Sequence, residues 1–161
     1  MLKYATKDVT YTEVPDELSL TYAITGCEGN CKGCHSAHLR ENTGKDLLPD
    51  LKKDILKYKG LVTTVCFLGG DDNINGLKRA INEVKKLGLK TALYTRREQT
   101  LFENIVDFLK TGPYIEKYGG LNKPSTNQRM FKIIDDNKVD ITYKFQTVYK
   151  YFLKYSFLIV R

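Results

Sequence analysis

The sequence predicts an α/β fold in which parallel strands alternate with helices. Three observations predict it: short β-branched or apolar runs recur along the chain, amphipathic segments separate them, and glycine-containing turns follow them. The order is strand, loop, helix, strand, helix, strand, helix, strand, which is typical of a parallel sheet with helical crossovers. In such folds ligands collect where the carboxyl ends of the strands meet.

The first half of the chain contains two predicted strands and a helix. Residues 2–14 are expected to be irregular or weakly extended. Residues 18–25 alternate apolar with small or polar side chains, which predicts a strand. Pro49 suits the first turn of a helix that Gly60 ends. Residues 62–68 form a β-branched and aromatic run of the kind buried inside a sheet.

The second half continues the alternation and then changes character. Four segments follow from periodicity and capping signals: a helix at 74–87, a strand at 89–94, a short helix at 100–106 opened by a capping box of Thr100 and Glu103, and a strand at 107–110. Residues 129–135 and 139–145 are then expected to form a hairpin that turns at Asp136 and Asn137.

Three cysteines follow the first predicted strand on one glycine-rich loop. Cys27, Cys31 and Cys34 have the spacing C-x3-C-x2-C. Thiols this close usually converge on a metal, and the intervening glycines let the backbone wrap around it. Three thiolates are one short of a closed tetrahedral set. The loop therefore predicts either a 4Fe–4S cluster with one open iron or a zinc site completed by a histidine.

The remaining cysteine and both histidines define those alternatives. His35 and His38 are the candidates for a fourth zinc ligand, and the competing interpretation makes them capping or surface residues. Cys66 lies in the middle of a predicted strand, so we expect a buried core thiol. The turn Gly69-Gly70-Asp71 follows that strand and is expected at the same edge of the sheet as the cysteine loop. Alone, it also fits a strand-to-helix turn with Asp71 or Asp72 as the N-cap.

Composition limits the function classes. The chain has 161 residues, enough for one domain with a proper core, and 42% are hydrophobic and 28% charged. No apolar run approaches the roughly 18–20 residues that span a bilayer, and the first residues lack a secretory core, so we expect a cytoplasmic protein. The net charge is +7, but the basic residues are scattered and no nucleic-acid motif occurs, so no nucleic-acid partner is predicted.

Several short motifs together resemble a known family. They are C-K-G-C-H-S at 31–36, C-F-L-G-G-D at 66–71, G-P-Y-I-E at 112–116, G-G-L-N-K-P at 119–124 and T-N-Q-R at 126–129. With the cysteine spacing, they resemble the radical S-adenosylmethionine enzymes, and most closely the activating proteins of anaerobic ribonucleoside-triphosphate reductase. The resemblance covers residues 1–146 as a single domain. The apolar, aromatic tail at 147–161 lies outside it and is unassigned.

The resemblance implies a fold, cofactors and partners. The fold would be an incomplete (β/α) barrel of radical S-adenosylmethionine type, with a 4Fe–4S cluster that binds S-adenosylmethionine through its open iron. The implied activity is reductive cleavage of that cofactor and generation of a glycyl radical on the large subunit of the reductase. A low-potential donor such as flavodoxin or ferredoxin would supply the electron. The alternatives are an activase of another glycyl-radical enzyme and a non-catalytic zinc-binding module.

The resemblance also implies site residues. Cys27, Cys31 and Cys34 would hold the cluster, and no catalytic side chain is implied beyond cluster and cofactor. The set implied or suggested for cofactor binding is Gly69, Gly70, Asp71, His35, Tyr94 and Thr95, with the first three at the methionyl ammonium. Asn127, Gln128 and Arg129 would contact the active site or the partner. Related enzymes often have an aromatic residue before the last cysteine, where this chain has Gly33, so His35 is the candidate for the adenine contact.

Overall fold

The computed structural model describes residues 1–146; the tail at 147–161 lies outside the described residues. One eight-stranded sheet runs through this part, in the order β3-β1-β2-β4-β5-β6-β7-β8. The elements are β1 (Lys3–Thr10), β2 (Ser19–Ile24), a 3-10 turn (Ala37–Arg40), β3 (Lys45–Asp46), α1 (Leu47–Lys57), β4 (Thr64–Leu68), α2 (Ile74–Lys86), β5 (Lys90–Tyr94), β6 (Phe108–Thr111), β7 (Arg129–Ile134) and β8 (Asn137–Asp140).

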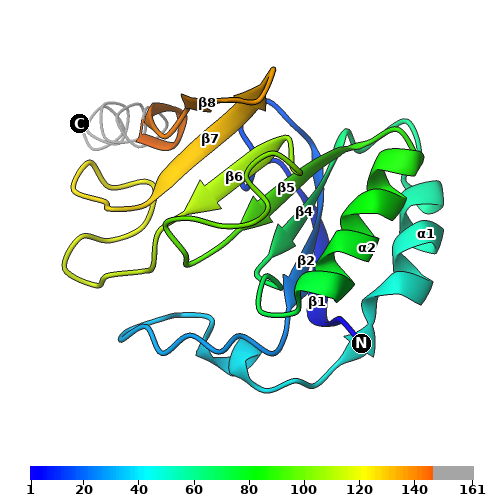
Figure 1. Ribbon diagram of the computed structural model, residues 1–161, viewed down its shortest axis with the longest axis horizontal. Helices are drawn as coiled ribbons and strands as arrows, with labels where there is room; N and C mark the ends of the chain where they lie inside the picture. The colour runs from blue at the N-terminus through cyan, green and yellow to red at the C-terminus, as the bar shows by residue number, and fades with distance from the viewer. Residues whose placement is uncertain (147–161) are drawn as a thin grey trace, which may run out of the picture.

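The centre of the sheet is parallel and its flanks are antiparallel. Strands β2, β4, β5 and β6 pair in parallel. On one side β1 and β3 add antiparallel pairings, and on the other side β7 and β8 do the same. The parallel arrangement predicted from the sequence therefore holds for the four central strands. Their carboxyl ends meet at one edge, from which the cysteine loop leaves (Figure 1).

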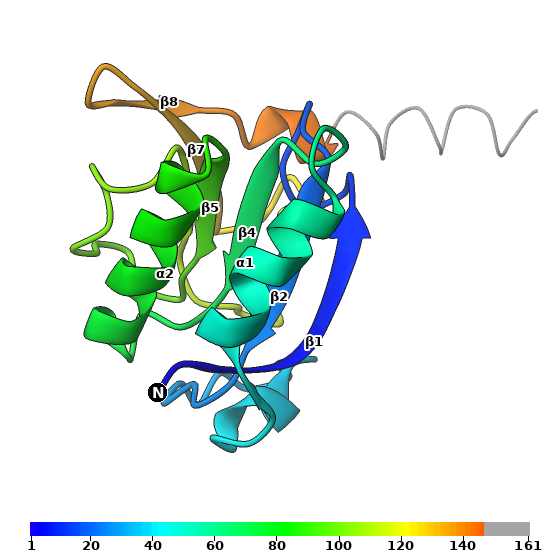
Figure 2. The same ribbon diagram turned by 90° about the vertical axis from the view of Figure 1, so that its right-hand side faces the viewer.

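Two helices cover one face of the sheet. Figures 1 and 2 show α1 and α2 side by side on the same face, and both are amphipathic. They bury one main core, which includes Val65, Leu93 and Leu109 from alternate strand positions. The strand residues between these point to the other face. A second buried cluster lies there and includes Cys66, Phe108 and Met130, so the expectation of a buried Cys66 thiol is confirmed.

The segment 2–14, expected to be irregular or weakly extended, instead contains the eight-residue strand β1. The side chains of β1 are largely polar, so the hydrophobic pattern of the sequence does not indicate a strand there. In the structure β1 lies between β2 and β3, and its Lys7 ammonium contacts the buried Asp54 carboxylate of α1 at 2.5 Å. The Asp54 carboxylate also accepts a 2.8 Å hydrogen bond from the Tyr22 hydroxyl of β2. Tertiary pairing thus stabilises a strand that local pattern does not predict.

The short helix predicted at 100–106 is wrong, because residues 101–105 form only turns. Phe102 and Val106 are both buried in the main core, which fixes this segment over a short span before β6. Glu103 does not complete the capping box, since its carboxylate accepts from the Lys138 ammonium at 3.0 Å. A propensity signal over so few residues is outweighed by these side-chain contacts.

The C-terminal hairpin is confirmed with different bounds. Its turn lies at Asp135 and Asp136, both in the left-handed region with φ of 48° and 60°. Two such residues form the tight turn that matches strand twist. The second strand ends at Asp140 rather than at residue 145, and residues 143–146 are helical.

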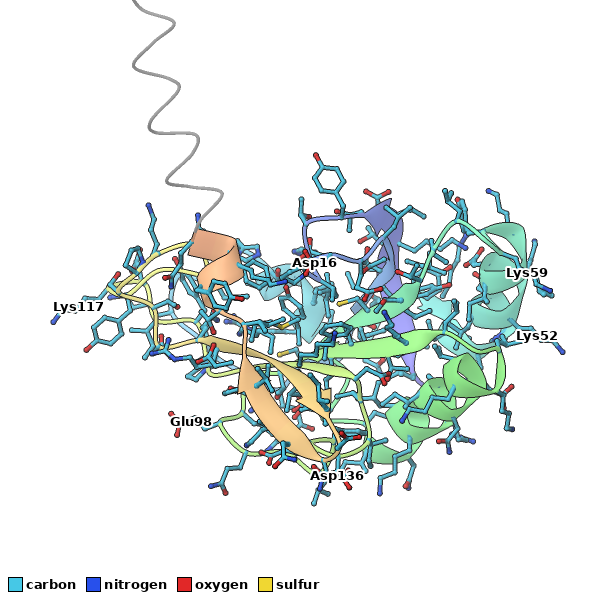
Figure 3. The ribbon with its side chains drawn as sticks, turned by 90° about the horizontal axis from the view of Figure 1, so that it is seen from above. Asp16, Lys52, Lys59, Glu98, Lys117 and Asp136 are labelled. Atoms are coloured by element: carbon cyan, nitrogen blue, oxygen red, sulfur yellow. The ribbon has the colours of Figure 1, made fainter. Side chains whose placement is uncertain are left out.

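Three exposed lysines lie on two opposite sides of the molecule. Figure 3 shows Lys52 and Lys59 on the helical side of the molecule and Lys117 at the opposite extremity. All three are exposed. No helix within residues 1–146 is long and apolar enough to cross a membrane.

Candidate functional site

The cysteine loop leaves the carboxyl end of β2 and is anchored by its own backbone. The Cys27 amide donates to the Leu39 carbonyl at 3.1 Å. The Arg40 guanidinium donates to the carbonyls of Gly29 at 2.9 Å and Cys31 at 3.3 Å. Cys27, Cys31 and Cys34 are all free and half-buried. The loop therefore offers three reduced thiols at the edge where the parallel strands end.

The donor set fits a thiolate-bound group, although the thiols are not preassembled. Within residues 1–146, no set of three or more His, Cys, Asp or Glu side chains is close enough to hold one metal ion. This applies equally to the three-cysteine set and to sets that include His35 or His38. Gly26, just before Cys27, and Gly33, between Cys31 and Cys34, adopt φ of 80° and 71°, a region that glycine enters without strain. Closure of this loop would bring the thiols together.

The two histidines lie on the outside of this loop. Both His35 and His38 are exposed, and His38 lies in the 3-10 turn. The His35 ring meets the Tyr114 ring edge-on, with ring centres 6.4 Å apart. The segment after β6 thus lies over the cysteine loop, and the Glu116 carboxylate also lies close to Gly33. Sequence reasoning included the motif G-P-Y-I-E but assigned no role to Tyr114 or Glu116.

The Gly-Gly-Asp turn follows β4 and approaches β2 closely. Gly69 and Gly70 have φ of 92° and 100°. A side chain at Gly70 would place its Cβ 3.1 Å from the Ile24 Cγ2 atom. The N-cap of α2 is Asn73, whose side chain accepts from the Gly76 amide at 3.0 Å. The alternative in which Asp71 or Asp72 caps this helix is therefore wrong.

Asp71 and Asp72, which do not cap α2, connect the end of β4 to the end of β5. The buried Asp71 carboxylate accepts through Oδ2 from the Thr95 hydroxyl at 2.7 Å and from the Arg97 guanidinium at 3.0 Å. Asp72 contacts Arg97 and Arg96 at 2.7 and 2.8 Å. Asp72 Oδ2 also accepts from the backbone amide of Glu28 in the cysteine loop at 3.0 Å. The turn thus links the cysteine loop to the end of β5. Sequence reasoning missed Asp72, Arg96 and Arg97, although paired Asp-Asp and Arg-Arg after successive strands would have been a usable signal.

Tyr94 and Thr95, suggested from the sequence as cofactor-binding residues, face different surroundings. Thr95 is 2% exposed and belongs to the Asp71 network. Tyr94 packs against the second buried cluster, and its hydroxyl donates to the Glu13 carbonyl at 2.5 Å. Burial raises the pKa of the Tyr94 hydroxyl well above its ordinary value. Thr95 therefore lies beside the other candidate site residues, whereas the Tyr94 hydroxyl is already engaged.

The Asn127-Gln128-Arg129 segment folds back onto the end of β6. The Asn127 amide donates to the Pro113 carbonyl at 3.0 Å, and the Gln128 amide donates to the Gly112 carbonyl at 3.4 Å. The Asn127 Oδ1 atom is buried and without a hydrogen-bond donor. Arg129 is exposed and donates to the Thr126 and Gln128 carbonyls at 2.9 Å. The structure brings Asn127 and Gln128, but not the Arg129 charge, to the loop beside the cysteines.

Sequence reasoning missed Lys110, a buried cation at this edge. Lys110 lies on β6 in register with Tyr94 and Met130, and it is only 7% exposed. Its ammonium donates to the Gly112 carbonyl at 2.7 Å. Burial lowers the pKa of Lys110 to about 8, while the nearby Cys31, Cys34 and Asp71 favour its charged form. A lysine inside the otherwise buried strand F-L-K-T was the available signal.

Comparison with protein-family models, curated proteins and solved structures found no match. The interpretation of the site therefore depends on the chemistry of its own residues. Three thiols, a carboxylate-bearing glycine turn and a buried ammonium meet at the carboxyl ends of four parallel strands. This edge is where ligands collect in sheets of this kind.

Proposed function

We propose that this chain is an iron–sulfur enzyme of radical S-adenosylmethionine type, built on an incomplete (β/α) barrel. Its substrate would be the large subunit of anaerobic ribonucleoside-triphosphate reductase, on which it generates a glycyl radical. The observation that supports this best is that the loop with three half-buried thiols and the Gly69-Gly70-Asp71 turn both leave the same edge of the parallel strands. The motif resemblance then specifies the reaction and the partner.

Cys27, Cys31 and Cys34 would hold three irons of a 4Fe–4S cluster, because no fourth cysteine lies on this loop and Cys66 is buried within the sheet. When bound, the cluster supplies the electron that splits the sulfonium bond of S-adenosylmethionine into methionine and a 5′-deoxyadenosyl radical. The proposed product of this chemistry would be a glycyl radical on the partner. The role of the protein is to hold the reacting groups in position and exclude water.

Asp71 is suited to bind the methionyl ammonium. Its two contacts within the described residues, from Thr95 and Arg97, both fall on Oδ2. Oδ1 receives neither of these contacts, and we assign it to the ligand. The Gly70 carbonyl already accepts from the Asn73 amide at 3.0 Å. Asp71 Oδ1 and the Gly69 carbonyl are therefore the acceptors of this turn that we assign to the ammonium.

We place the reaction in the cytoplasm, where free thiols stay reduced and a low-potential donor such as flavodoxin or ferredoxin can supply the electron. The test is anaerobic reconstitution with iron and sulfide, followed by metal analysis. Wild-type protein should bind about four irons and absorb broadly in the visible range. On addition of reductant, S-adenosylmethionine and the reductase subunit, electron paramagnetic resonance should show a glycyl radical.

Single Cys→Ala changes at positions 27, 31 and 34 should each abolish cluster binding, since three thiolates act as one unit. Cys66→Ala is the matched control, because it removes a thiol from the sheet and should retain iron at a cost of about 1 kcal/mol in stability. His35→Ala and His38→Ala should also retain iron. A tightly bound zinc that either histidine variant releases would instead establish the zinc-binding module and refute the radical enzyme.

A further inference from the structure

Two positively charged side chains interact with the cysteine loop. The Arg96 side chain lies against Gly29, where an added Cβ would stand 2.5 Å from Arg96 Cδ and 3.3 Å from Cys27 Sγ. The buried Lys110 ammonium is held on the Gly112 carbonyl, at the start of the segment whose Tyr114 and Glu116 lie against the cysteine loop, and its charge interacts with Cys31 and Cys34. Thiolates and sulfides make an iron–sulfur group anionic, so both cations lie where such a group would need countercharge.

The two cations differ in their partners. Arg96 is already paired, because its guanidinium contacts the Asp72 carboxylate at 2.8 Å. Lys110 forms no ion pair within 4 Å among the described residues, and its single hydrogen bond there goes to the Gly112 carbonyl. An ammonium has three donors, and a buried charge is normally paired or fully hydrogen-bonded. Two donors of Lys110 are thus unused in this part of the chain.

We propose that Lys110 is the buried counter-ion of the cysteine loop, where it positions Cys31 and Cys34 and stabilises the negative charge of the iron–sulfur group they hold. This inference rests on the proposed function. In this inference the role of Lys110 is electrostatic. Its positive charge favours closure of the cysteine loop, and the same charge favours the reduced state of the cluster over the oxidised state. Because Lys110 is buried, solvent ions screen its charge less than they would screen an exposed one.

The test is the reduction potential of the reconstituted cluster in Lys110→Met, which keeps the length of the side chain and removes its charge. At a fixed solution potential, the ratio of reduced to oxidised cluster should fall by about tenfold or more, which is about 59 mV for a one-electron couple. Lys110→Arg should restore most of the shift. Lys90→Met is the matched control, since Lys90 lies at the opposite end of neighbouring β5 and pairs with Glu17; its potential should match wild type.

Each outcome has one meaning. If wild type forms no iron–sulfur cluster, the proposed function fails and this inference fails with it. A cluster with wild-type potential in Lys110→Met would overturn the role of Lys110 and leave the proposed function intact. Should Lys110→Met fail to load iron while Lys110→Arg loads it, the charge requirement is supported by loading itself. Failure of both variants, with normal thermal unfolding of the iron-free proteins, would show that charge is not what matters and would overturn the proposal.

Discussion

At the amino ends of the parallel strands the buried carboxylate of Glu17 accepts three hydrogen bonds, whereas at their carboxyl ends the buried ammonium of Lys110 donates one. Glu17 receives hydroxyls from Thr63 and Thr64 and the ammonium of Lys90, which joins three chain segments. Its charge is satisfied within the fold. The charge at the other end is left available for a ligand, and this is the end that bears the three thiols.

The pKa values of Glu17 and Lys110 differ in the same sense as their hydrogen bonding. Burial raises the pKa of Glu17, but the hydrogen bonds from Lys90, Thr63 and Thr64 outweigh burial and hold it below its ordinary value. Burial dominates at Lys110 and lowers its pKa to about 8. The fold therefore stabilises the charged form of Glu17 and disfavours that of Lys110. Such a cost is common at functional sites, where structure is retained for binding rather than for stability.

The largest expected effect contrasts these two residues directly. Glu17→Ala should lower the free energy of unfolding by about 2–3 kcal/mol, because it removes charged hydrogen bonds and leaves the buried Thr64 hydroxyl without this acceptor. Lys110→Met in the iron-free protein should cost less than about 0.5 kcal/mol, since replacing a buried charge by an apolar group is often neutral. Urea unfolding measures both, with exposed Glu98→Ala as the control. Equal losses of unfolding free energy in Glu17→Ala and Lys110→Met would show that Lys110 is a structural residue like Glu17.

A second contrast concerns carboxylates at the two ends. Asp71→Asn should weaken S-adenosylmethionine binding to the iron-loaded protein by about 1.5–3 kcal/mol and cost about 1 kcal/mol or less in stability. Asp107 precedes β6 at the opposite end and accepts from the Thr91 amide at 2.7 Å and hydroxyl at 2.8 Å. Asp107→Asn should therefore lower stability and leave binding unchanged. Equilibrium binding and urea unfolding separate the two, and unchanged affinity in Asp71→Asn would remove Asp71 from the site.

Gly70 and Gly88 allow the stability cost of an added side chain to be compared at the two ends of the sheet. Gly70 and Gly88 both have positive φ, at 100° and 78°, so alanine at either position should cost about 1–2 kcal/mol. Nothing lies within 4 Å of a Cβ at Gly88, whereas a Cβ at Gly70 would contact Ile24 at 3.1 Å. Gly70→Ala should therefore unfold at lower urea than Gly88→Ala. If the two variants unfold together, the close approach of the Gly70 turn to β2 is unimportant for stability.

The smallest expected effect is the acid dependence of the Glu17 pair. Its folded-state pKa lies below the ordinary value of 4.5, so its stabilisation is fully present above pH 4.5. That stabilisation is lost as the pH falls through the lower, folded-state value. The difference in unfolding free energy between wild type and Glu17→Gln should therefore be constant from pH 7 to pH 5 and shrink below pH 4.5. Urea unfolding across this range measures it, and a difference that grows on acidification would reverse the sign of the linkage.

Much of the central fold is determined by local sequence. The buried runs that become β2, β4, β5 and β6 and the periodicity of α2 specify elements whose side chains bury one whole face or stripe. Such patterns survive in the fold because burial favours the same residues that the pattern marks. The cysteine loop and the Gly69-Gly70 turn were likewise placed at the carboxyl edge from strand order alone.

Other features were decided only by the tertiary structure. Strand β1 exists because β2 and β3 pair with it, and the segment at 100–106 stays a turn because Phe102 and Val106 are drawn into the core. Asn73 rather than Asp71 is the N-cap of α2, and Asp71 instead contacts Thr95, which lies 24 residues further along the chain, directly after β5.

The sequence by itself determined that three thiols share a loop, that a glycine turn follows a buried strand and that both lie at one edge of a parallel sheet. It did not determine what surrounds them. Whether Lys110 is exposed or buried depends on which loops cover the end of β6, and the charges that favour its ionised form come from residues distant in the chain, Cys31, Cys34 and Asp71. Hydrophobic pattern is a local property, whereas the balance between desolvation and charge pairing is set by neighbours that only folding brings together.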